Sequence, residues 1–305
     1  MNWFYVALLG YTLLAVVFIL DKFIVTKSVK PVVYAFYSTI FMFGAVLALP
    51  FFGWGILSGV DWFWAVVSGV AFGLGMWALF VAVKKGEATH INPFNGATVT
   101  IFTYGLAFYF LQESLSSLQI AGMVVLVLSS FLLSFEKSRK YSGFHMGFVW
   151  AIVAGLLFAV SHVSAKYLYS LYPFWDAFIW TRATTGLVGL FLLLFPAVRK
   201  SFKRSPRINK EKPKTYGKRH VLGLVVSDKI LSIVAIILLQ YAMAIGTVTI
   251  VLALSGLQYV LMFVLVFLLT KFSPTIFKEY FTKRELKLQV IAIILVVLGS
   301  ALFVL

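Results

Sequence analysis

Several ionisable residues interrupt or end long apolar stretches of this sequence, where a titratable side chain is costly and usually has a function, and five of them are candidates for chemistry. His162 and Lys166 are four residues apart and would share one face of a helix. Arg182 lies in the following apolar stretch. Together these three basic residues could bind an anionic or zwitterionic small molecule, so we predict them as ligand-binding residues. The structural alternative is that Lys166 extends to a polar boundary, while Arg182 pairs with Asp176 or with a backbone carbonyl.

The other two ionisable residues, Asp21 and Asp228, are acidic, and we predict them as proton-coupling residues. Asp21 ends the first apolar stretch, and Asp228 follows His220 by eight positions near the start of the eighth. A carboxyl group that carries a proton through a cycle needs a raised pKa, which an apolar environment provides. An interfacial position for Asp228 is equally compatible with the sequence.

The remaining residue types argue against metal and enzymatic chemistry. The sequence contains no cysteine, which excludes disulfides and thiolate metal sites. Its four histidines lack HxxxH or HExxH spacing, so we predict no metal site, no cofactor and no catalytic residue. A membrane-embedded lipid enzyme is kept as an alternative. No Walker motif is present, so we do not expect nucleotide hydrolysis to drive the protein.

The composition shows which elements must hold these residues. Of the 305 residues, 62% are hydrophobic and 12% are charged, compared with about half and about a quarter in soluble domains. Many apolar stretches reach the length of about 20 residues that a membrane-spanning helix needs, and they lack the alternation of β-barrel strands. The first stretch has no signal-peptide cleavage site, so we count it as a span. We predict an all-α polytopic membrane protein with ten transmembrane helices, at residues 2–25, 31–52, 62–83, 93–111, 117–135, 144–169, 174–197, 220–243, 247–270 and 286–305.

The positive charge is concentrated on alternate connections between these spans. The net charge is +16, which in a soluble protein would suggest nucleic-acid binding, but 23 of the 26 Lys and Arg residues lie on the odd-numbered connections. The positive-inside rule therefore predicts cytoplasmic odd connections and both termini outside an inner or plasma membrane, without a nucleic-acid partner. The segment 199–219 holds ten basic residues and is expected to be a solvated loop; contact with anionic lipids is the alternative.

The two halves of the sequence resemble each other. At an offset of 160 residues, Gly86, Thr89 and Gly96 match Gly246, Thr249 and Gly256. At an offset of 142, the segment that begins at Pro31 matches the segment that begins at Pro173. At an offset of 170, the segment that begins at Leu118 matches the one that begins at Leu288. We predict two five-helix repeats, 1–140 and 141–305, with a basic loop at 198–219 and an insertion at about 274–284 in the second.

An odd number of spans per repeat means that the second copy enters the membrane from the opposite side. Such inverted repeats are common in secondary transporters, which bind substrate near the membrane midplane between the halves. We therefore expect a secondary carrier that works by alternating access.

The sequence also resembles the ten-helix EamA-type members of the drug/metabolite transporter superfamily. The resemblance rests on the turn Lys85-Gly86-Glu87-Ala88-Thr89 and its repeat Ile245-Gly246-Thr247-Val248-Thr249. It also rests on an acidic hinge, Phe110-Leu111-Gln112-Glu113-Ser114, followed by Leu118-Gln119-Ile120-Ala121-Gly122. The second copy lacks this acidic hinge. Many relatives have cytoplasmic termini, whereas the charge bias here predicts the reverse.

The resemblance implies transport of a small metabolite, for which an amino acid or a related compound is the first expectation and a sugar nucleotide or phosphate ester the alternative. It also implies that the helices of the two matched turns line a central cavity. Asn95 and Ser255 occupy equivalent places before matched glycines, which favours this pair. Ordinary interhelical hydrogen bonding is the alternative for most of these residues, and no oligomeric state is predicted. The other candidate lining residues are Trp77, Tyr104, Gln258 and Tyr259.

Overall fold

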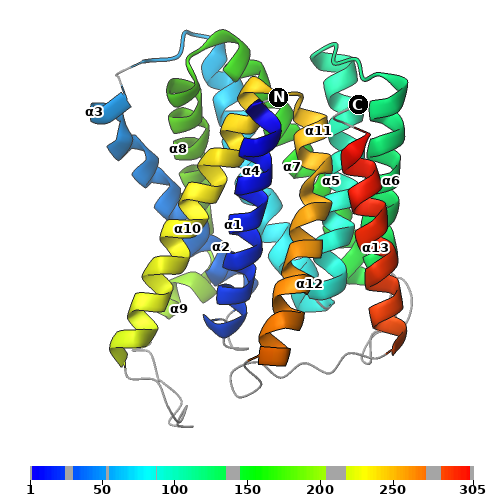
Figure 1. Ribbon diagram of the computed structural model, residues 1–305. Helices are drawn as coiled ribbons and strands as arrows, with labels where there is room; N and C mark the ends of the chain where they lie inside the picture. Colours follow the sequence, from blue (N-terminus) through cyan, green and yellow to red (C-terminus); the bar gives the residue numbers. More distant parts are fainter. Residues whose placement is uncertain are drawn as a thin grey trace.

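The computed structural model describes seven parts of the chain, and every regular element in them is helical (Figure 1). These parts are residues 2–24, 30–52, 55–86, 88–134, 145–203, 218–272 and 283–302. The predicted all-helical fold is therefore confirmed for the described residues. The first group of elements is α1 (Asn2–Ile24), α2 (Pro31–Ile40), the 3-10 helix η1 (Phe41–Ala48), α3 (Leu49–Phe52), α4 (Asp61–Lys85), α5 (Ala88–Phe110) and α6 (Ser117–Ser134). The second group is α7 (Met146–Leu171), α8 (Phe174–Leu192), α9 (Pro196–Lys203), α10 (Lys218–Ile245), α11 (Val248–Ala253), α12 (Ser255–Phe272) and α13 (Lys283–Ala301).

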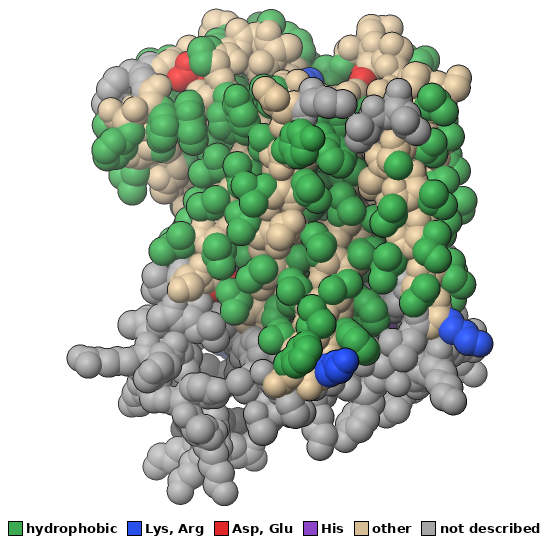
Figure 2. All heavy atoms as spheres, viewed as in Figure 1, with side chains coloured by type: hydrophobic (Ala, Val, Ile, Leu, Met, Phe, Trp, Pro, Cys, Tyr) green, Lys and Arg blue, Asp and Glu red, His purple; other side chains and the backbone are tan. Residues whose placement is uncertain are grey.

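Length and apolar composition identify this bundle as a polytopic membrane protein. Six described segments are long and apolar enough to cross a membrane, and a seventh is added if the bent pair formed by α8 and α9 counts as one. Figure 2 shows hydrophobic side chains spread across the middle of the face that it displays. The six segments are Asn2–Leu20, Pro31–Phe52, Asp61–Lys85, Ser117–Ser134, Met146–Leu171 and Val248–Leu269.

Several helix boundaries differ from the predicted ones. The stretch predicted at 174–197 ends at Leu192 and turns by 93° into α9. Proline explains this turn, because Pro196 cannot donate to the carbonyl of Leu192 and its ring would clash there. α9 also makes the beginning of the basic segment helical, whereas a loop was expected. The basic residues at 204–217 lie outside the described residues, and so do positions 274–282 of the insertion predicted at about 274–284.

Two further stretches are divided or extended. The stretch predicted at 247–270 is divided at Leu254, where α11 gives way to α12. The hydroxyl of Tyr11 on α1 donates to the carbonyl of Val251 at 2.8 Å close to this break. α5 begins five residues before Pro93, which the helix accommodates in its interior. Membrane helices tolerate such prolines where neighbouring groups satisfy the freed backbone.

Two glycines of α4 let it pack closely against α8. A Cβ on Gly69 would overlap the hydroxyl of Thr184, and one on Gly73 would lie 2.7 Å from Cγ2 of Val188. The Thr184 hydroxyl also donates to the carbonyl of Ala65 at 2.8 Å. Small residues four positions apart commonly permit such close approach in membrane helices. This packing holds the middle of α8 against the bundle interior.

The two termini lie at the same end of the bundle (Figure 1). The helix ends that border the basic segments lie at the opposite end of the bundle (Figure 1). The last turns of α4 and α12 and the helix α9 carry exposed basic residues, namely Lys84, Lys85, Lys271, Arg199 and Lys200. The described part of the chain therefore gathers its exposed basic residues at one end, as expected if the basic connections share a side.

Candidate functional site

The most unusual group in the described interior is the guanidinium of Arg182, in the middle of α8. This side chain is 1% exposed. Its Cζ lies 4.3 Å from the centre of the Phe72 ring on α4. Within the described ranges, none of its three nitrogens has a hydrogen-bond acceptor. The alternative of pairing with Asp176 is not observed, because that carboxylate lies against Gly55 in the segment before α4.

The structure brings His162 to the same place. His162 lies on α7, is 8% exposed and interacts electrostatically with Arg182. Its ring centre lies 6.2 Å from that of Phe72 and 6.4 Å from that of Phe158. Its Nδ1 has no hydrogen-bond partner in the described part of the chain. Arg182, His162 and Phe72 thus form a buried group from three helices, which we call the Arg182 cluster.

Lys166 lies one turn beyond His162 on α7, but its ammonium group contacts the end of α10. Its Nζ donates to the carbonyl oxygens of Met243 and Ala244 at 2.9 Å and of Gly246 at 2.7 Å. An ammonium group has three donors, and all three are used here. A cation at this position is also favoured by the partial negative charge at the end of α10. Lys166 therefore has no donor left for a ligand in this conformation.

Tyr169 and Gln240, which were not among the residues predicted to bind a ligand, form a partly buried polar contact. The Tyr169 hydroxyl on α7 donates to Oε1 of Gln240 on α10 at 2.8 Å, and Tyr169 also interacts electrostatically with Arg182. Tyr169 follows His162 by seven positions, which is two helical turns, so the spacing places both on one face of α7. The spacing of seven residues from His162 was the signal that could have identified Tyr169. With 14 tyrosines in the sequence, this spacing did not distinguish Tyr169 from the others.

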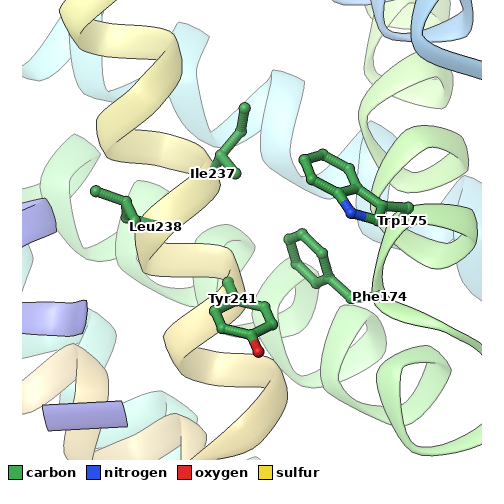
Figure 3. Close-up of a pocket in the computed structure, with 5 residues that line it drawn as sticks. All are labelled: Phe174, Trp175, Ile237, Leu238 and Tyr241. Atoms are coloured by element: carbon green, nitrogen blue, oxygen red, sulfur yellow. The ribbon is translucent and has the colours of Figure 1, made fainter. Parts of the chain in front are cut away.

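An apolar crevice of about 400 Å³ separates the beginning of α8 from the upper part of α10. In Figure 3 the rings of Phe174 and Trp175 point from α8 toward α10. The ring centre of Phe174 lies 5.2 Å from that of Tyr241 and 5.3 Å from that of Phe178. Phe174, Phe178 and Arg182 are spaced four residues apart and so follow one face of α8 over about 12 Å. The crevice is lined by Phe174, Trp175, Ile237, Leu238 and Tyr241.

The predicted pair Asn95 and Ser255 lies at a second contact, between α5 and α12. A Cβ on Gly96 would lie 3.2 Å from Oγ of Ser255 and 3.1 Å from the hydroxyl of Tyr259. The same hydroxyl donates to the carbonyl of Asn92 at 2.8 Å. Oδ1 of Asn95 is buried without a hydrogen-bond partner among the described residues. Most of this contact is interhelical hydrogen bonding and close packing, which was the alternative interpretation.

The other predicted lining residues are dispersed. Trp77 packs on Phe195, with ring centres 5.4 Å apart, in a cluster formed with α2 and α8. Tyr104 packs on Phe108 at the main core, and Gln258 is buried in α12. No contact found in the described part of the chain joins these three side chains to the Arg182 cluster.

Of the two acidic residues predicted to couple transport to protons, the structure describes the side chain of Asp228 only. Asp228 is fully buried in α10, and its carbonyl accepts a hydrogen bond from the Ser232 hydroxyl at 2.8 Å. The side chain of Asp21 lies outside the described residues. Across the ranges that the structure describes, no three His, Asp or Glu side chains gather where they could hold a metal ion.

Glu113 is a further functional candidate, and it lies in the connection between α5 and α6. Its Oε2 accepts a hydrogen bond from the Thr249 hydroxyl at 3.1 Å, at the beginning of α11. The connection turns sharply because Gln112 adopts a positive φ of 53°. Burial raises the pKa of the Glu113 carboxyl above its ordinary value, although the bonds to Thr249 and the charge of Lys166 partly oppose the shift.

Comparisons with known proteins agree with this architecture. One solved structure, titled "Crystal structure of protein", aligns over 99% of this chain and 94% of its own, with 17% sequence identity and a TM-score of 0.65. That similarity shows a shared fold over nearly the whole chain. No curated protein matches the sequence. Residues 1–135 match the family described as "EamA-like transporter family". The first part of this chain is therefore similar to the EamA-like transporter family, which belongs to the drug/metabolite transporter superfamily.

Proposed function

We propose that this protein is a secondary transporter that carries a small organic metabolite across the membrane by alternating access between two inverted five-helix halves. The observation that carries this proposal is the Arg182 cluster. An uncompensated cation in a membrane interior is costly and is usually kept for a substrate or ion pathway. The family of the first 135 residues consists of transporters, which gives the cluster a functional context.

The packing of the helices supports two inverted halves. In the predicted repeat, α10 is the counterpart of α4, and α1 is the counterpart of α7. α4 packs along α7, and α10 packs along α1 in the same way. α6 packs against its counterpart α13, and α2 against its counterpart α8. Two copies related by a two-fold axis in the membrane plane would produce this pairing. The six segments and the bent pair of α8 and α9 give seven crossings. If α5, α10 and α13 also span the membrane, the last two with the apolar parts Ile230–Ile245 and Val290–Ala301, the bundle would cross it ten times.

Two equivalent threonines also support the repeat. Thr39 and Thr181 occupy matching positions at the offset of 142 residues. Thr39 donates to the carbonyl of Ala35 and Thr181 to that of Ala177, both at 2.8 Å. The two alanines match at the same offset, so the copies share a local structure as well as a sequence pattern.

A proton gradient is the energy source that we propose, with Asp228 as the coupling residue and Asp21 as the second candidate. The complete burial of Asp228 in α10, inside the bundle, supports this role. We place the protein in the inner or plasma membrane, with its basic end in the cytoplasm and both termini outside.

Transport into proteoliposomes tests this proposal. The purified protein is reconstituted, and uptake of a panel of labelled amino acids, organic acids and phosphate esters is measured with and without a pH gradient. We expect gradient-stimulated uptake of at least one compound, a loss of at least about tenfold in Arg182→Gln, and full uptake in the exposed control Lys200→Gln. If no compound is taken up and the reconstituted protein instead turns over lipid, the carrier proposal is wrong and the enzyme alternative holds.

A further inference from the structure

We propose that the substrate is a small organic monocarboxylate with an apolar or aromatic body, whose carboxylate pairs with Arg182 while its body occupies the face of α8 that leads to the crevice. This inference rests on the proposed function and names the chemical class of the transported compound. It also selects among the amino acid, phosphate-ester and sugar-nucleotide classes that the sequence left open.

The charge of Arg182 requires an anion. A buried ion without a partner is far less stable than a buried ion pair, because it has lost its hydration and gained nothing in return. Arg182 is 1% exposed, and the described residues provide no acceptor for its nitrogens. The contact with Phe72 stabilises the positive charge through the ring face and uses none of the N–H donors. The donors therefore stay available for a ligand.

The shape of the guanidinium favours a carboxylate. Its N–H groups form a planar fork that matches the two oxygens of a carboxylate, so that two parallel hydrogen bonds form. His162 lies beside this fork with its Nδ1 unpaired among the described residues. A neutral imidazole can donate a further hydrogen bond to the same anion.

The number of available cations in the interior favours a substrate with a single negative charge. The three donors of Lys166 are held by the carbonyl oxygens at the end of α10. Arg182 is thus the one free cation that we find in the described interior. A phosphate monoester or a sugar nucleotide carries about two charges and would be left with one uncompensated. A monocarboxylate balances the site.

The absence of a nearby carboxylate argues against an amino-acid zwitterion. Among the described residues, the side chains found to interact electrostatically with Arg182 are those of His162 and Tyr169, and neither is acidic. Tyr169 in turn donates to Gln240 on α10. Asp228 precedes Gln240 by twelve residues, which is about 18 Å along α10. A substrate ammonium next to Arg182 would therefore lack a counter-charge and would repel the guanidinium.

The crevice indicates the nature of the rest of the molecule. Its volume of about 400 Å³ is within the range of small-ligand sites, and its lining is apolar and aromatic. Phe174 lines the crevice and packs on Phe178, and Phe178 precedes Arg182 by one turn of α8. A compound with a carboxylate at one end and an aromatic ring at the other would satisfy both the charge of Arg182 and the apolar face next to it.

Four matched compounds test the inference by direct binding to the full-length protein in detergent. They are 3-phenylpropanoate, its neutral amide, phenylalanine and phenethyl phosphate, which share a phenyl ring and differ in charge. We expect 3-phenylpropanoate to bind most tightly by calorimetry. Arg182→Gln should weaken it about 10- to 100-fold, and Arg182→Lys, which keeps the charge without the fork, should weaken it by an intermediate factor. Lys200→Gln is the charge-matched control and should bind as the wild type does.

A second set of variants tests where the apolar body of the substrate binds. Trp175→Ala should weaken 3-phenylpropanoate several-fold but leave acetate unaffected, whereas Leu190→Ala, at an exposed position of α8, should change neither. Gel filtration and circular dichroism of each variant exclude misfolding as the cause. Tighter binding of the amide, phenylalanine or the phosphate, or wild-type affinity in Arg182→Gln, would overturn the inference.

The two proposals fail in different ways. Carboxylate binding that depends on Arg182, without uptake into liposomes, supports the ligand class and contradicts the transporter. Uptake of another class of compound that is unaffected by Arg182→Gln supports the transporter and contradicts the ligand class.

Discussion

The carboxylate of Glu113 lies 3.1 Å from the hydroxyl of Thr249, which ties the connection after α5 to the first turn of α11. Lys166 holds the other side of the same turn through three carbonyl oxygens at the end of α10. An anion thus meets a helix beginning and a cation meets a helix end, which is the favourable order for both helix dipoles. Glu113 comes from one predicted half, and Lys166, Thr249 and the end of α10 come from the other.

Glu113 should make the stability of the protein depend on pH. Because burial raises the pKa of this carboxyl in the folded state, the folded protein binds a proton more readily than the unfolded chain does. The free energy of unfolding should therefore fall as the pH rises from the ordinary Glu pKa through the raised folded value. Unfolding by SDS in mixed micelles across this pH range measures the effect. Glu113→Gln should remove this part of the dependence; an unchanged pH profile in that variant would contradict the assignment.

Lys166 should contribute to stability and not to substrate affinity. Lys166→Met leaves three carbonyl oxygens without their charged donor, and we expect the free energy of unfolding to fall by about 2–3 kcal/mol. Lys200→Met, at an exposed position, should change it by less than about 0.5 kcal/mol. The measurement is the same micelle unfolding assay, combined with ligand binding per folded molecule. Wild-type stability with lost binding would place Lys166 in the substrate site instead.

The contact between α4 and α8 should be sensitive to a single methyl group. In Gly69→Ala the new Cβ meets the Thr184 hydroxyl and the backbone of α8, so we expect a loss of about 1–3 kcal/mol. Gly105→Ala is a matched control in another helix, because nothing lies within 4 Å of its added Cβ. That variant should be neutral or more stable by about 0.5–1 kcal/mol, since alanine favours a helix interior. Equal effects of the two substitutions would show that the α4–α8 packing is looser than described.

Both termini should face away from the cytoplasm. Alkaline phosphatase becomes active only outside the cytoplasm, whereas a fluorescent protein becomes fluorescent only inside it. Alkaline phosphatase fused after Leu305 is therefore expected to be active, and a fluorescent protein at the same place is expected to be dark. Reporters inserted in the basic segment at 204–217 should give the opposite pattern. A bright C-terminal fluorescent fusion would reverse the proposed orientation.

Helical structure and membrane insertion could be predicted from the sequence because they depend on local composition. Runs of apolar residues of sufficient length leave few other ways to satisfy the backbone in lipid. Breaks within these runs were harder to predict. Pro196 explains the end of α8 at Leu192, whereas the division at Leu254 has only the weaker signal of the Ser255-Gly256 pair that follows it.

The candidate site was only partly predictable, as three basic residues show. His162, Lys166 and Arg182 look alike in the sequence, since each interrupts an apolar stretch. Helical spacing placed His162 and Lys166 on one face of α7, and both do lie on that helix. What each side chain contacts depends on α10 and α4, which are distant in the sequence, so spacing alone could not distinguish them.

The sequence by itself determined an all-helical membrane protein and predicted that its basic residues lie on alternate connections, because hydropathy and charge act on each segment separately. The tertiary structure alone decided that Lys166 caps α10 while Arg182 stays buried without an acceptor among the described residues. The physical reason is that the state of a buried charge is set by the groups packed around it, and those groups come from helices that only folding brings together.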